Sequence, residues 1–127
     1  MSSEHDEKTG TVKISDEVIA ICAVNAVQRT QGVSDLSPVF SDNFSKNILG
    51  KEPLYKGIKI SQNEEGISID IFVVVDYGVK IPAVAWDIQD NVKKEVEEMT
   101  DSQVKAVNIH VQGVRMKDEV GADHEQV

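Results

Sequence analysis

The fold is decided by one stretch of sequence, Ile81-Pro-Ala-Val-Ala-Trp-Asp-Ile-Gln-Asp-Asn-Val-Lys-Lys-Glu-Val-Glu-Glu-Met-Thr100 followed by Val104-Lys-Ala-Val-Asn-Ile-His-Val-Gln-Gly-Val114. In the first part, apolar residues recur at helical spacing, which predicts an amphipathic helix with Pro82 in its first turn. The predicted inner stripe consists of Ala85, Ile88, Val92, Val96 and Met99. The second part alternates, which predicts a strand with Val107, Ile109 and Val111 facing inward and Asn108, His110 and Gln112 facing outward.

Upstream of this stretch, a β-hairpin is predicted from Ile58–Ser61 and Ile67–Val75, joined by a turn that contains Gly66. The second strand alternates along its whole length. One face carries Ile67, Ile69, Ile71, Val73 and Val75, and the other carries Ser68, Asp70, Phe72 and Val74. Such alternation is typical of a strand with one face toward a core.

The N-terminal part predicts a short strand at Thr11–Ile14, then a helix capped by Ser15 that runs to about Thr30. A short strand at Val33–Leu36 follows the predicted helix stop at Gly32. The inner face of this helix is predicted to hold Ile19, Ala20, Ala23, Ala26 and Val27. Its other face is too apolar to be purely solvated, because it holds Val18, Ile21 and Cys22, so a second element or a partner should cover it.

Together these elements predict an α+β fold. A single open sheet carries two main helices on one face, in the order β-α-β-β-β-α-β. The predicted domain covers residues 11–116, between acidic tails at 1–10 and 117–127 that are expected to be disordered. The connection 38–57 is predicted to be variable. Within it Phe40, Phe44 and Ile48 are spaced by four, which suggests a turn or two of amphipathic helix.

The charge of the chain excludes some classes of partner. Its 127 residues carry a net charge of −9, and the two tails supply more than half of it. A chain of this sign with scattered basic residues is a poor general nucleic-acid binder and adsorbs poorly to anionic lipid. The longest apolar run, Val18–Val27, is too short to span a bilayer, and the polar N-terminal residues are not expected to act as a secretion signal. We therefore expect a cytoplasmic protein without direct membrane insertion, whose membrane association, if any, comes from a partner.

No pattern in the sequence indicates a catalytic site. There is no nucleophile with a base, no phosphate-binding loop and no cluster of metal ligands, so no catalytic, cofactor-binding or metal-binding residue is predicted. His110 and Asp70 could meet across neighbouring strands, where a simple cross-strand contact is favoured over a general-base pair. The single cysteine, Cys22, is predicted to be a small buried hydrophobe rather than a reactive thiol.

Candidate interface residues are more informative. Trp86 lies away from the centre of its helix stripe, so it is either covered by a neighbouring loop around residues 40–50 or exposed as a protein–protein hot spot. The open face of the sheet adds Phe72, Val74, His110 and Gln112, and the first helix adds Val18 and Ile21. We expect self-association through one of these surfaces, with Trp86 the first choice.

The order and spacing of several segments resemble one family, the alkaline-shock proteins of Gram-positive bacteria, which are grouped under envelope stress response. The resemblance covers about residues 11–116. It is carried by Val12–Ile19, Gly32-Val33, Lys56–Ile60, Ile67–Val75 with Tyr77-Gly78, Ile81-Pro82, Ile88-Gln89, Val92-Lys93, Met99-Thr100 and Val107–Val114.

The resemblance implies a non-enzymatic protein-interaction module in cell-envelope stress response and homeostasis, held near the membrane by an integral-membrane anchor protein. The alternative that it leaves open is a regulatory partner of a cytoplasmic fatty-acid or phospholipid synthesis enzyme. A nucleic-acid-binding domain, the third possibility, is disfavoured by the charge and by the absence of a basic patch.

Overall fold

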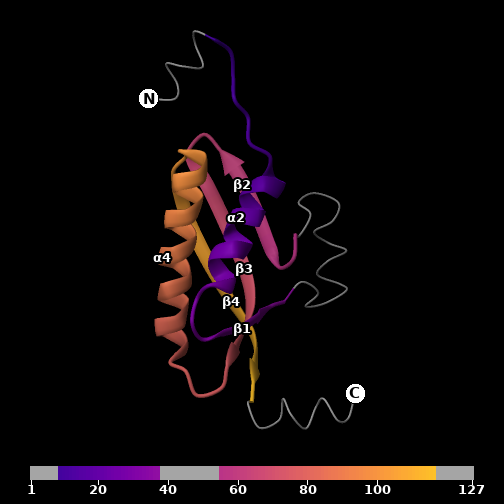
Figure 1. The fold of residues 1–127 in the computed structure, drawn as a ribbon, viewed down its shortest axis with the longest axis vertical. Helices are drawn as coiled ribbons and strands as arrows, with labels where there is room; N and C mark the ends of the chain where they lie inside the picture. The colour runs from indigo at the N-terminus through magenta and orange to yellow at the C-terminus, as the bar shows by residue number, and fades with distance from the viewer. Residues whose placement is uncertain (1–8, 38–54, 117–127) are drawn as a thin grey trace.

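The computed structural model describes residues 9–37 and 55–116 (Figure 1). The two predicted tails, apart from Thr9 and Gly10, and the predicted helical turns at Phe40, Phe44 and Ile48 lie outside these residues. The described elements follow one another as α2 (Asp16–Gln28), β1 (Val33–Leu36), β2 (Ile58–Asn63), β3 (Gly66–Asp76), α4 (Ile81–Thr100) and β4 (Val104–Arg115).

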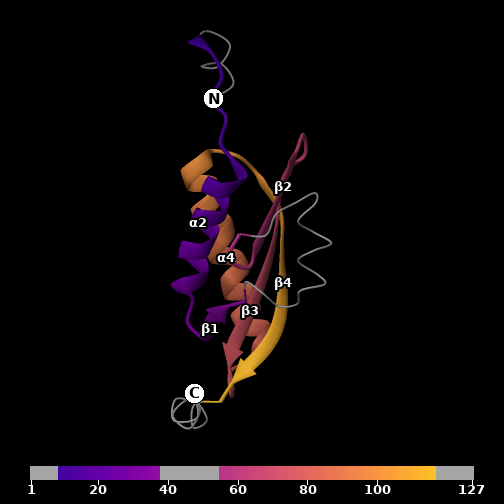
Figure 2. The same cartoon turned by 90° about the vertical axis from the view of Figure 1, so that its right-hand side faces the viewer.

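The predicted fold class is confirmed. The protein is α+β, with a single open sheet and both main helices on one of its faces (Figure 2). From residue 16 onward the elements come in the predicted order. One detail is wrong, because Thr11–Ile14 does not form a strand. There the carbonyl of Ile14 accepts a hydrogen bond from the side chain of Gln62 (3.2 Å) rather than from the backbone of a strand.

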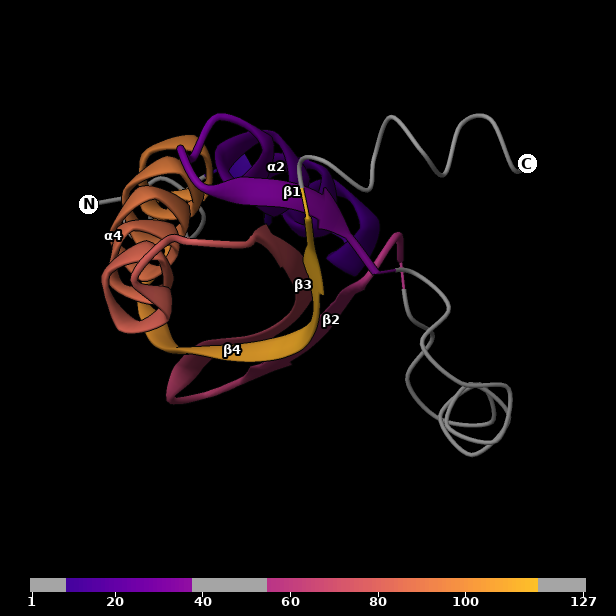
Figure 3. The same ribbon diagram turned by 90° about the horizontal axis from the view of Figure 1, so that it is seen from below.

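The sheet is built around β3. β1 and β2 both pair antiparallel with it and share one of its edges, and β4 runs parallel along the other edge. The two short strands meet at Phe72, whose N–H donates to the carbonyl of Gly57 (2.9 Å) and whose carbonyl accepts from the N–H of Ser37 (2.8 Å). Viewed from below, the sheet curls so that α4 lies against β4 and α2 lies near β1 and β2 (Figure 3).

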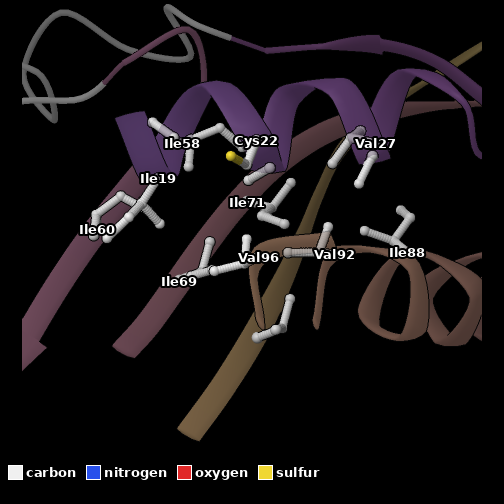
Figure 4. Packing of buried hydrophobic residues seen from close by; sticks show 14 of the residues in the cluster. Ile19, Cys22, Val27, Ile58, Ile60, Ile69, Ile71, Ile88, Val92 and Val96 are labelled. Carbon is white, nitrogen blue, oxygen red and sulfur yellow. The ribbon is translucent and has the colours of Figure 1, made fainter. Parts of the chain in front are cut away.

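The core lies between the helices and the sheet, where Ile19, Ile71, Ile88, Val92 and Val96 are fully buried (Figure 4). The N-cap predicted for the first helix is confirmed, since the Ser15 hydroxyl accepts from the N–H of Val18 (3.2 Å). The prediction that Cys22 is a small buried hydrophobe is confirmed. Cys22 is only 6% exposed and belongs to the core cluster.

The inner face of α4 differs from the prediction at its two ends. Val84 and Thr100 are buried in place of Ala85 and Met99, and Met99 is exposed. The buried positions recur strictly every four residues, which turns the stripe about 40° around the helix at each step. The buried stripe therefore winds slowly around α4, and this winding leaves Met99 at the surface.

Polar contacts fix α2 against α4. The Glu95 carboxylate accepts from Asn25 (3.1 Å) and forms an ion pair with Arg29. One turn further along, the Asn91 amide donates to the hydroxyl of Thr30 (2.9 Å). These pairs run in opposite directions along the two helices, so α2 and α4 are antiparallel.

Candidate interaction surfaces

Trp86 projects from the outer side of α4. Trp86 is 74% exposed, as expected of a protein–protein hot spot, and the loop around residues 40–50 that could cover it lies outside the described residues. Trp86 borders a shallow hollow of about 520 Å³ whose other lining residues are Asp87, Gln89, Asp90 and Lys93. An exposed tryptophan beside a hollow can receive an apolar or cationic group of a partner.

Some of the charged side chains around the hollow have an ion-pair partner and one does not. Lys93 forms an ion pair with Glu97 (2.7 Å), and Asp90 forms one with Lys94 (3.1 Å). Asp87 has no ion-pair partner within the described part of the chain. The surface beside the indole ring is therefore weakly acidic.

A second apolar surface lies on α2, where Val18 and Ile21 are about half exposed. Because α2 and α4 are antiparallel, these residues lie near the end of α4 that carries exposed Met99. Sequence reasoning missed Met99, since it assigned this residue to the inner stripe. The α2 surface and Trp86 therefore lie at opposite ends of the helix layer.

The open face of the sheet holds the remaining candidate residues. Phe72 is buried, and its ring stacks on the imidazole of His110 with centroids 4.5 Å apart. The predicted contact between Asp70 and His110 is confirmed, with the carboxylate 3.0 Å from Nε2. Val74 is half-buried and Gln112 is exposed. The predicted interface residues thus lie on three separate surfaces and do not form one site.

The titratable side chains bear on two kinds of chemistry, metal binding and a reactive thiol. Within residues 9–37 and 55–116, no three or more His, Cys, Asp and Glu side chains are grouped to hold a metal ion. Burial raises the pKa of the Cys22 thiol, and the nearby charge of Glu95 adds to this effect. The reactive thiolate is therefore disfavoured, which supports the prediction of Cys22 as a core residue.

Among the described residues, no helix is long and apolar enough to cross a membrane. The fold defines a small α+β domain with exposed apolar side chains on both helices. The comparisons with known proteins agree with this class. The model of the alkaline shock protein 23 family, described as having a cell envelope-related function, matches residues 4–116. The chain belongs to the alkaline-shock protein family, as the resemblance of its sequence predicts.

Relatives in Gram-positive bacteria are similar over most of the chain. The uncharacterized protein YloU of Bacillus subtilis is 39% identical over 120 residues, which cover 91% of this chain and 98% of YloU. The uncharacterized protein YqhY of the same organism is 34% identical, covering 87% of this chain and 81% of YqhY. A stress response regulator gls24 homolog of Streptococcus pyogenes is 24% identical, covering 90% of this chain and 64% of that protein.

Proposed function

We propose that this protein is a non-enzymatic interaction module of the cell-envelope stress response, held near the membrane by an integral-membrane partner and able to self-associate. The observation that carries the proposal is the exposed Trp86 in a chain whose family is described as envelope-related. Buried interface tryptophans commonly contribute about 2 kcal/mol or more to binding. The absence of a membrane-crossing helix among the described residues is consistent with an anchor supplied by another protein.

The proposal is tested by affinity capture of the tagged full-length chain from membrane and soluble fractions of the native cells. We expect an integral-membrane protein that is lost when Trp86→Ala is used and retained with Glu98→Ala, an exposed change elsewhere on α4. Capture of a fatty-acid or phospholipid synthesis enzyme alone, from the soluble fraction, would contradict the proposal and favour the regulatory alternative.

A further inference from the structure

The outer edge of β4 is closed in its first half by side chains of α4. The N–H of Val104 donates to the Glu97 carboxylate (2.9 Å), and the carbonyl of Val107 accepts from the Gln89 amide (2.9 Å). Exposed backbone groups on an edge strand are a template for pairing with another strand, and such side-chain contacts block it. No comparable contact exists beyond Val107 in the described residues.

The register shows which groups this open half presents. Phe72 directs its N–H and carbonyl away from β4, toward Gly57 and Ser37, so its neighbours in β3 direct theirs toward β4. Ile71 is in register with Ile109, and Val73 is in register with Val111. In a parallel ladder a residue does not bond to its register partner but to the two residues that flank this partner. The backbone N–H and carbonyl groups of Ile109 and Val111 therefore point outward, and none of them has a hydrogen-bond partner in the described part of the chain.

We propose that this open edge pairs antiparallel with the same edge of a second copy of the chain, with the two His110 residues opposite each other at the twofold axis. In this register Ile109 of one copy faces Val111 of the other. Both residues present outward groups, so their N–H and carbonyl groups bond reciprocally. The pairing leaves the Gln89–Val107 hydrogen bond intact and joins the two sheets into one.

The side chains of β4 favour a second copy as the occupant. Antiparallel pairing in this register places apolar Ile109 beside apolar Val111 on the helix face. On the open face it places Asn108 beside Gln112. Apolar side chains thus meet apolar ones on the helix face, and polar side chains meet polar ones on the open face, so the edge is complementary to itself, as an isologous interface requires.

The charges on β4 are compatible with the same arrangement. The chain carries −9, but β4 contains no acidic residue and includes Lys105 and Arg115. Arg115 has no ion-pair partner among the described residues, and Lys105, near the other end of the strand, is bound to Glu65 (2.7 Å). In this register Arg115 of each copy lies opposite Lys105 of the other, whose positive charge is already balanced by the ion pair with Glu65.

Trp86 lies at the same end of the molecule as this seam. α4 runs antiparallel to β4, since Gln89 contacts Val107 and Lys93 contacts Val104. One turn before Gln89, Trp86 is therefore on the side of the open half of β4. The inference deepens the proposed function by naming the surface used for self-association, and it does not depend on the membrane partner.

A cysteine cross-link tests the register. Residues that face each other in a non-hydrogen-bonded antiparallel pair have Cα atoms about 4.5 Å apart, within the range for a disulfide. Full-length His110→Cys should form a covalent dimer under mild oxidation, whereas the matched control Asn108→Cys, displaced from the axis, should not. Native Cys22 is buried and should not contribute. No dimer from His110→Cys, or equal dimer from both variants, overturns the proposal.

A second variant keeps the test independent of the His110 side chain. Val111→Pro removes an N–H that points outward and takes no part in the ladder with β3, a position where an edge strand tolerates proline. Sedimentation of the purified chain should show a shift from dimer to monomer, with the helical and strand circular dichroism unchanged. A wild-type chain that is monomeric at about millimolar concentration, or a folded variant that remains dimeric, overturns the proposal. Neither result bears on capture of a membrane partner.

Discussion

At the scale of single residues, burial separates two neighbours on α4 that the sequence assigns to opposite faces. Val92 is fully buried, whereas Asp90 is exposed and forms an ion pair with Lys94. Val92→Ala should lower the free energy of unfolding by about 2–4 kcal/mol, as large-to-small changes in a core do. Asp90→Ala should lower it by less than about 0.5 kcal/mol. Urea denaturation measures both, and similar losses would contradict the orientation of α4.

Two glycines allow the effect of a steric clash to be separated from the effect of the backbone angle. Gly32 and Gly78 have nearly the same backbone angle, φ +98° and +99°, which costs other residues about 1–2 kcal/mol. A Cβ on Gly32 would lie 2.7 Å from Cγ2 of buried Val84, whereas one on Gly78 would meet nothing within 4 Å. Gly32→Ala should therefore lower the thermal midpoint clearly more than Gly78→Ala. Equal shifts would mean that only the backbone angle matters at these sites.

At the scale of elements, Glu97 joins α4 to the start of β4. Its carboxylate accepts from Lys93 and from the N–H of Val104, and these contacts lower the pKa of Glu97 below its usual value. A lowered pKa in the folded state gives stability that is present above the unfolded pKa of about 4.3 and is lost as the pH falls through the folded value.

Glu97→Gln should accordingly lower the thermal midpoint at pH 7, and the difference from the wild type should shrink as the pH falls below about 4. Lys94→Met, which removes a charge from an exposed pair on the same helix, serves as the control and should change the midpoint little at any pH. A Glu97→Gln deficit that stays constant down to about pH 2 would show that the charge of Glu97 does not act through these contacts.

Helices and strands were predictable from the sequence where the periodicity of apolar residues matches the set of side chains that is buried. The alternation of β3 and the spacing of Ile88, Val92 and Val96 predict which side chains are buried, because each pattern has a single period. The burial of Cys22 was also predicted, but the sequence does not identify α4 as the element that packs beside α2. Thr11–Ile14 has the composition of a strand, but the Ile14 carbonyl accepts from the Gln62 side chain instead of joining the backbone ladder, so local propensity is overridden.

The candidate surfaces were predictable to a smaller extent. The position of Trp86 relative to its stripe identifies it as an outer residue, yet its 74% exposure required knowledge of what lies beside α4. The open half of β4 could not be read from the sequence, because it depends on the reach of Gln89 and Glu97 from another element. Side chains that cover a strand edge come from another element, so no pattern in the sequence of the strand itself predicts them.

At the scale of the whole molecule, the net charge sets how the protein meets a lipid surface. Each basic residue near an anionic membrane contributes roughly 1 kcal/mol of attraction, and this chain has 13 basic against 22 acidic residues. The exposed apolar residues of α2 adjoin Asp16 and Glu17 at its first turn, so repulsion opposes insertion of that surface.

Purified protein should therefore stay in the supernatant when it is sedimented with phosphatidylglycerol-rich liposomes at physiological salt. It should behave in the same way with zwitterionic liposomes, which control for adsorption that does not depend on charge. In native cells the protein should nevertheless fractionate with membranes, and this association should disappear when the integral-membrane partner is removed. Tight binding to bare anionic liposomes would contradict the prediction, because the apolar surfaces of α2 and α4 would then be sufficient to hold the protein at the bilayer against its own charge.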